Sequence, residues 1–298
     1  MQKNSKIMLR GYIMTIIGAT FWGFSGTCGQ YLMSTKGLDA KIIVNTRLIF
    51  AGLILILLSL YKNKTETFKI FKNKKDTLTL IAFGIFGMLF CQFSYLITIS
   101  KTNAPTATVL QFLSSIFIVV GVCIKEMRAP KIKEISSIAL ALLGTVVLAT
   151  HLDLSTLVIS SSGLFWGILA AFSVVIYTLL PINILKKYSS SVVTGFGMFI
   201  GGIVITFLLQ PWKFSVNFDM MTILGLIAMI VFGTVLAFNC FLTGVSIIGP
   251  VRGSLIAGLE AVSSLLFSII LLKESFMMID LFGMLLILMA VTVLSFNK

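Results

Sequence analysis

Long apolar runs alternate with short polar segments along almost the whole chain. We draw ten such runs, at residues 12–33, 40–60, 78–99, 104–124, 134–150, 163–182, 191–209, 222–245, 250–272 and 277–296. Each is close to the ~20 residues that a helix needs to cross the roughly 30 Å hydrocarbon core of a bilayer. Because most connections are very short, neighbouring helices must run antiparallel. The pattern therefore predicts an all-α polytopic membrane protein with ten transmembrane helices.

Composition supports the same class. Hydrophobic residues make up 58% of the chain, charged residues only 11%, and the mean hydropathy is +1.07, whereas a typical soluble domain is about 25% charged. The longest polar interval, residues 61–77, is too short to bury a core of its own. The first apolar run follows three basic residues, as in a signal peptide. It is too long for one and lacks a cleavage site, so we interpret it as the first transmembrane helix.

The formal net charge is +13, and the basic residues lie in the short loops between apolar runs. We interpret this charge as a topological signal and as contact with anionic lipid, so no nucleic-acid partner is expected. Placing the N-terminus in the cytoplasm puts most lysines and arginines on that side, which predicts that both termini are cytoplasmic. The four cysteines all lie in apolar runs without metal-ligand spacing. We therefore expect neither a metal site nor a cofactor.

The two halves of the chain repeat several short motifs. "ATFWGF" at 19–24 is matched by "GLFWGI" at 163–168, and "APTATVL" at 104–110 is matched by "GPVRGSL" at 249–255. Further short matches follow in the same order and at nearly the same offset, which indicates an internal duplication.

We therefore divide the chain into two repeats, residues 1–150 and residues 151–298, each with five spans. An odd number of crossings makes the second repeat enter the membrane from the opposite side. Two inverted five-helix repeats are the architecture of many secondary transporters, which bind their substrate near the bilayer midplane where the repeats meet. The duplication thus predicts transport by alternating access.

The motifs resemble those of the EamA-type, ten-helix branch of the drug/metabolite transporter superfamily. They are the duplicated Phe-Trp-Gly, the Ala-Pro or Gly-Pro that opens the fourth and ninth spans, and the Lys-Glu that closes each of them. The strings "TRLIFAGLIL" at 46–55 and "ATVLQFLS" at 107–114 are similar to YicL-type members from the bacterial inner membrane. The resemblance implies a central cavity lined mainly by the first, third, fourth, sixth, eighth and ninth spans. It also implies export of amino acids or other small metabolites, with one branch importing or exchanging.

Glu260 is an acidic residue near the middle of the run 250–272. A carboxylate at that depth is costly unless it faces a cavity, a cation or a source of protons. We interpret Glu260 as a group that couples protons or coordinates a cation. The alternative is a structural carboxylate, hydrogen-bonded to helix ends or paired with a buried cation. Its counterpart in the first repeat is Gln111, which is polar but cannot titrate.

Arg47 lies about seven residues into the second span. It could bind a substrate carboxylate, pair with Glu260, or extend outward to the headgroups as a structural residue. We favour the structural interpretations, because an arginine near a helix end has a short route to the membrane surface.

Further candidates for the central cavity are Gln92 and Tyr95 in the third span and Asn239 in the eighth. They either line the cavity or join helices by hydrogen bonds. Trp22 and Trp166 each precede a glycine. They either form a cavity wall for a cationic or aromatic substrate or pack into a glycine notch.

Enzymatic chemistry finds no support in the sequence. The single histidine, His151, has no cysteine or serine partner at a usable spacing, and no glycine-rich phosphate loop precedes a lysine. We expect a secondary transporter of the bacterial cytoplasmic membrane that exports a small polar metabolite in a proton-linked cycle, as a monomer or weak dimer. Rival interpretations are a uniporter or exchanger whose flux ignores the proton gradient, and a membrane scaffold or lipid-handling protein.

Overall fold

The computed structural model describes residues 2–101, 107, 108, 110, 111, 113–150, 152, 153, 161–213, 218–273 and 277–295. These residues are helical apart from turns and short loops, and they contain no strand. Six stretches among them are long and apolar enough to cross a membrane: Ser5–Ser34, Ala40–Lys62, Lys74–Lys101, Ser161–Leu185, Ser190–Leu209 and Met220–Ile248. The predicted class, an all-α polytopic membrane protein, is confirmed. Both Pro105 and His151 lie outside the described residues.

Every predicted apolar run overlaps at least one helix of the structure. In chain order the helices are α1 (Gln2–Ser34), α2 (Ala40–Lys62), α3 (Lys64–Thr67), η1 (Lys69–Lys72), α4 (Lys74–Ala82), the π-helix η2 (Phe83–Leu89), α5 (Phe90–Lys101), α7 (Ser114–Glu126), α8 (Ile132–Thr150), α9 (Ser161–Leu179), α10 (Ile182–Leu185), α11 (Ser190–Leu209), η4 (Pro211–Lys213), α12 (Met220–Ile230), the π-helix η5 (Val231–Leu236), α13 (Ala237–Ile248), α14 (Pro250–Ile256), α15 (Leu259–Leu272) and α16 (Met278–Ser295).

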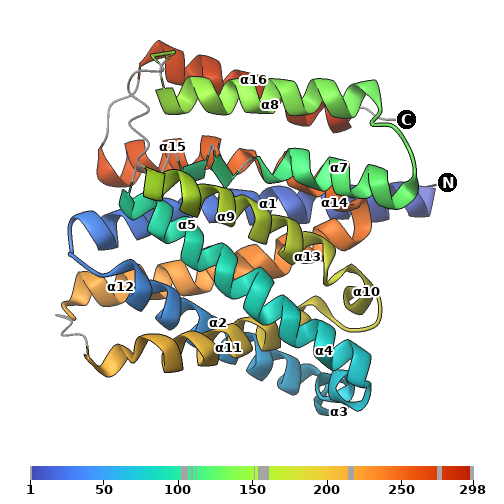
Figure 1. Cartoon of the computed structure of the whole chain (residues 1–298), viewed down its shortest axis with the longest axis vertical. Coiled ribbons are helices and arrows are strands. Elements are labelled where there is room, and N and C mark those ends of the chain that lie inside the picture. Colours follow the sequence, from blue (N-terminus) through green and yellow to red (C-terminus); the bar gives the residue numbers. More distant parts are fainter. Residues whose placement is uncertain are drawn as a thin grey trace.

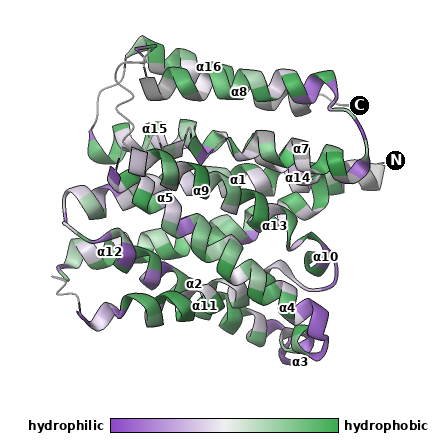
Figure 2. Ribbon diagram, viewed as in Figure 1, coloured by the Kyte–Doolittle hydropathy of each residue, from purple (hydrophilic) through white to green (hydrophobic). Residues whose placement is uncertain are grey.

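Helices from the two halves of the chain pack on each other throughout the bundle. The helix α1 lies against η5, α13 and α15, whereas α9 lies against η2, α5 and α7. The pairs α2 with α11 and α8 with α16 also cross between the halves, and the latter pair forms an outer layer of its own (Figure 1). Both marked termini lie at the same end of the bundle (Figure 1). The helices are largely hydrophobic along their length, and the most hydrophilic segment is around α3 (Figure 2).

Two of the long helices contain a π-helical segment at a similar position. In the first half it is η2, between α4 and α5, and in the second half it is η5, between α12 and α13. Glycines allow another helix to approach each segment closely. A Cβ at Gly87 of η2 would lie 3.0 Å from the Cα of Tyr177 in α9, and one at Gly233 of η5 would collide with Ser25 in α1. Segments of this kind are frequent at functional sites, because they widen the helix and redirect side chains.

The predicted helix over 250–272 is not continuous, which corrects our expectation. The helix α14 ends at Ile256, and α15 begins at Leu259. Around the break the backbone forms shorter-range bonds, such as Glu260 N–H to Ala257 O at 2.9 Å. Glu260 therefore lies in the first turn of α15, where the free N–H groups of a helix favour a negative charge.

Candidate functional site

A cavity lies about two thirds of the way along α1, between helices from both halves of the chain. It offers about 70 Å³ of space to the centres of water molecules, which is enough for several waters or a small polar group. Residues of the first, third, fourth, sixth, eighth and ninth spans line it, as the resemblance implied, and α2 contributes as well. The lining residues are Trp22, Ser25, Gly26, Arg47, Cys91, Gln92, Tyr95, Thr108, Gln111, Ser114, Val174, Tyr177, Thr178, Phe238, Phe241, Ala257 and Glu260.

Glu260 enters the cavity from α15 and has a phenol as its partner. Tyr95, from α5, lines the same cavity, and its hydroxyl interacts electrostatically with the Glu260 carboxylate. The same hydroxyl lies 3.2 Å from Oγ1 of Thr108. Three residues from three spans thus bring hydroxyl and carboxylate groups together at the cavity, and groups of these kinds can exchange a proton.

Arg47 enters the cavity from α2 and is only 5% exposed. Its Nε donates to Oγ1 of Thr234 at 3.1 Å, and its Nη2 donates to the carbonyl of Gly233 at 3.4 Å. Both acceptors belong to η5, so the π-helical segment holds the guanidinium inside the bundle. The expectation that Arg47 extends outward to the membrane surface is wrong.

Arg47 and Glu260 face the same cavity without touching. No ion pair within 4.0 Å joins them, although the two charges interact electrostatically across the cavity. The pairing that we considered from the sequence is therefore absent in this conformation. A buried cation and a buried carboxylate that do not neutralise each other directly are suited to opposite ends of a bound molecule.

Several buried polar atoms at the cavity wall have no hydrogen-bond partner in the described part of the chain. They are Nε1 of Trp22, Oγ of Ser25, and both Nε2 and Oε1 of Gln92. An unsatisfied buried donor or acceptor costs about 1–3 kcal/mol. Water or a ligand in the cavity would satisfy these atoms.

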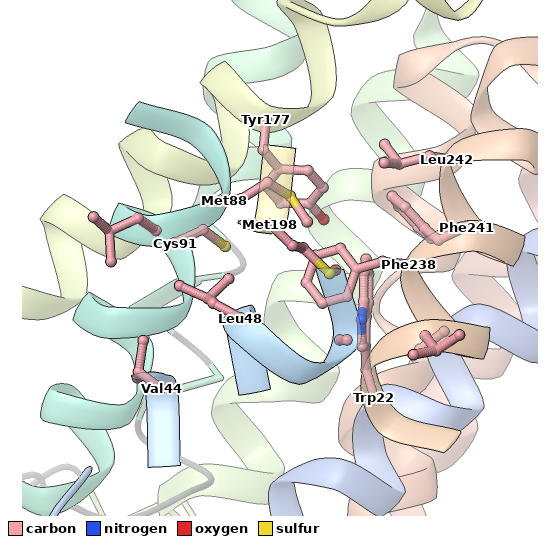
Figure 3. Close-up of a cluster of buried hydrophobic side chains, with 14 of the residues drawn as sticks. Trp22, Val44, Leu48, Met88, Cys91, Tyr177, Met198, Phe238, Phe241 and Leu242 are labelled. Carbon is pink, nitrogen blue, oxygen red and sulfur yellow. The ribbon is translucent and has the colours of Figure 1, made fainter. Parts of the chain in front are cut away.

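An aromatic wall closes one side of the cavity. The ring of Trp22 lies 4.3 Å from that of Phe241, 4.9 Å from that of Phe238 and 6.2 Å from that of Tyr177, centroid to centroid. Figure 3 shows these four rings gathered together, with Cys91 across from them. The rings exclude water and offer a surface to a cationic or apolar part of a ligand.

Six of the eight residues expected from the sequence line this cavity: Trp22, Arg47, Gln92, Tyr95, Gln111 and Glu260. Trp166 and Asn239 do not. Trp166 lines a second hollow of about 750 Å³ with Lys41 and Lys101. The Asn239 side chain accepts a hydrogen bond from Ser191 Oγ at 3.3 Å, so it joins two helices.

Sequence reasoning missed several lining residues. Ser25 lies three residues after Trp22 and thus on the same helix face, which was a usable signal. Tyr177 and Thr178 are polar positions inside an apolar run, which was another. Nothing in the sequence distinguished Phe238 and Phe241 from the many other phenylalanines.

A helical membrane fold with a polar cavity between its two halves is typical of membrane transporters. The chain belongs to the EamA-like transporter family, which it matches over residues 9–150 and again over residues 161–296. Each match spans about half of the chain, as expected of a duplicated protein.

Individual relatives agree with this assignment. The chain is 38% identical over 291 residues to the uncharacterized inner membrane transporter YicL of Salmonella typhimurium. The aligned region covers 97% of this chain and 96% of that protein. It is 24% identical over 302 residues to an uncharacterized transporter of Methanothermobacter thermautotrophicus, covering 97% and 87%. One solved crystal structure superposes with a TM-score of 0.77 at 15% identity, over 98% of this chain and 96% of the other. At that identity the match bears on the fold alone.

Proposed function

We propose that the protein is a secondary transporter of the inner membrane that exports a small polar metabolite through the central cavity. Its ten helices form two inverted five-helix halves, which rock about the cavity and expose it to one side at a time. A proton on Glu260 couples the cycle. No cofactor takes part, and a monomer is sufficient because one chain supplies both halves.

One observation carries the proposal: Glu260 and Arg47 are buried at the same cavity without an ion pair between them. Two charges are costly to bury in a membrane protein unless they act on a ligand or an ion. The break between α14 and α15 adds to this, since discontinuous helices commonly form the binding sites of transporters with inverted repeats. The repeated pairing of α1 with η5 and of α9 with η2 supports the two related halves.

Proton coupling follows from the surroundings of Glu260. The carboxylate can bind a proton when the cavity faces the side with more protons and release it after the halves have rocked. Tyr95 and Thr108 provide the hydroxyl groups next to it. A substrate with a positive group would compete with that proton, which links the two movements in opposite directions.

The first experiment identifies a ligand and then removes the carboxylate. A thermal-shift screen of the purified protein against amino acids, amines and nucleobases finds compounds that stabilise it by mass action. In proteoliposomes we expect an imposed pH gradient to drive flux of the best ligand in the wild type. We expect Glu260→Gln to lose that response while it still binds the ligand.

The matched control is Glu66→Gln, because Glu66 is an exposed glutamate on α3 outside the cavity. It should transport like the wild type. Flux in Glu260→Gln that follows the pH gradient as in the wild type would refute the proton-coupling role. Wild-type flux that ignores the gradient would instead favour the uniporter or exchanger, and a silent screen would favour the scaffold or lipid-handling protein.

A further inference from the structure

Within the described part of the chain, two ion pairs connect the first half to the second, and they lie at opposite ends of the bundle. Lys187 pairs with Asp76, and Lys36 pairs with Asp219. The helices that flank the first pair, α4 and α10, lie at the end that holds both termini (Figure 1). The connection from α1 to α2 and the start of α12, which flank the second pair, lie at the other end (Figure 1).

The first contact, which we call the Asp76 cluster, consists of Asp76, Lys187 and Tyr188. Asp76 lies in the first turn of α4 and is 5% exposed. Lys187 Nζ donates to its two carboxylate oxygens at 2.9 and 3.1 Å, and the Tyr188 hydroxyl donates to Oδ2 at 2.8 Å. Both donors follow α10, so moving the second half away from α4 would strip a buried carboxylate of all three bonds.

The second contact, which we call the Asp219 pair, is more exposed. Asp219 is the N-cap of α12 and accepts the backbone N–H of Thr222 at 2.7 Å. Lys36 follows α1 and donates from Nζ to the other carboxylate oxygen. Its ammonium also lies 5.9 Å from the ring centroid of Tyr31, which holds it close to α1.

The two contacts are built on the same plan. In each, a lysine that follows the first span of one half meets an aspartate at the start of the third span of the other half. The helices that these residues belong to also pack on each other: α1 lies on α12 and η5, and α9 lies on η2. Each contact therefore joins two packed spans at one end. The two contacts lie on opposite sides of the cavity.

We propose that the Asp76 cluster and the Asp219 pair are the two gates of the transport cycle. This rests on the proposed function, because a rocking cycle must separate the halves at one end while they stay joined at the other. Both contacts are formed in this structure. The Asp76 cluster has three bonds to a buried carboxylate, so it is the stronger gate, and the protein opens more readily at the Asp219 end.

Cys91 provides a reporter, because its thiol lines the cavity and is 4% exposed. Replacing Cys28, Cys123 and Cys240 by alanine leaves it as the single thiol. A membrane-impermeant maleimide is then added to sealed vesicles of each orientation, with a protease-sensitive tag at the N-terminus to report which side faces out. Labelling after unfolding in detergent measures the total thiol.

We expect Asp76→Asn to increase Cys91 labelling severalfold from the side of the termini. We expect Asp219→Asn to increase it from the opposite side, by a smaller factor because that gate is weaker already. The control is Asp39→Asn, since Asp39 is an exposed aspartate that caps α2 and forms no ion pair within the described chain. The charge-swapped pair of Asp76→Lys with Lys187→Asp should return labelling toward the starting value, which separates gating from loss of folding.

The outcomes are distinct. Labelling that does not differ from the control, or that rises equally from both sides in both variants, overturns the gates. If the wild type carries flux while the variants label like the control, the gates are wrong and the transporter stands. If no flux occurs but the side-specific labelling appears, the gates stand and the transported ligand or its coupling is wrong.

Discussion

The two Phe-Trp-Gly motifs have the same sequence but different surroundings. In α1, Trp22 is 8% exposed and lines the central cavity. In α9, Trp166 is only half-buried and packs edge-on to Phe93 at 5.5 Å, next to the second hollow. The duplicated motif therefore does not by itself specify a cavity residue.

The glycine of each motif has a similar role in both halves. Gly23 lets α1 lie on α15, where an added Cβ would be 2.5 Å from Ser264 N and 2.6 Å from Glu260 O. Gly167 lets α9 lie on the fourth span, where an added Cβ would be 2.8 Å from the Cβ of Leu110. Duplication has thus kept the helix packing in both halves, whereas the buried charges of Arg47 and Glu260 lie at the cavity beside Trp22.

The largest expected effect comes from the glycines. Gly23→Ala should destabilise the protein by about 1–3 kcal/mol, because its Cβ would meet the backbone of α15, which cannot turn away as a side chain can. Gly167→Ala should cost less, since its nearest neighbours are side-chain atoms of Leu110 and not the backbone of the facing helix. Unfolding by titration with a denaturing detergent measures the difference.

Gly121→Ala is the control for the glycine pair. Its added Cβ would have ordinary contact with Leu179 at 3.6 Å, and alanine is the better helix former. It should be neutral or slightly stabilising. Equal losses in Gly23→Ala and Gly167→Ala would mean that the two helix crossings are equivalent after all.

Much of the fold could be predicted from the sequence, and the reason is physical. Apolar runs of membrane length report helices directly, since backbone groups in lipid must be satisfied within a segment. The break before Glu260 could not be predicted, because alanine and glycine are also common inside continuous transmembrane helices. Likewise, the long side chain of Arg47 can extend either toward the membrane surface or toward the cavity. Its hydrogen bonds to η5 hold it at the cavity, and the sequence does not reveal them.

The next effect concerns the tryptophans. Trp22→Phe keeps an aromatic ring in the wall but removes the unpartnered Nε1 donor, so a ligand that accepts from it would bind more weakly. One lost hydrogen bond is worth about 0.5–1.5 kcal/mol, which corresponds to about two- to twelvefold in Kd. Trp166→Phe should leave Kd unchanged, because Trp166 lies outside the cavity.

The change in Kd of each tryptophan variant is measured with the best compound from the screen, as the ligand concentration that gives half of the maximal rise in Tm. Weaker binding in both variants would mean that the second hollow takes part in the same binding event. Unchanged binding in Trp22→Phe would leave its ring, and not its N–H, as the part that matters.

The smallest expected effect is the loss of stability from the Asp219 pair at low pH. It concerns a contact between the two halves at one end of the bundle. The hydrogen bond from Lys36 lowers the pKa of Asp219 to about 2, with help from Thr222. In the unfolded chain that pKa is about 3.9. The pair therefore contributes its full stability above about pH 4 and loses it as the pH falls through about 2.

The Tm difference between wild type and Asp219→Asn should be constant from pH 7 to pH 5 and shrink below pH 4. A difference that persists undiminished at pH 2 would mean that the negative charge of Asp219 does not stabilise the protein, because asparagine keeps the cap of α12. It would remove the ionic link between the halves at that end.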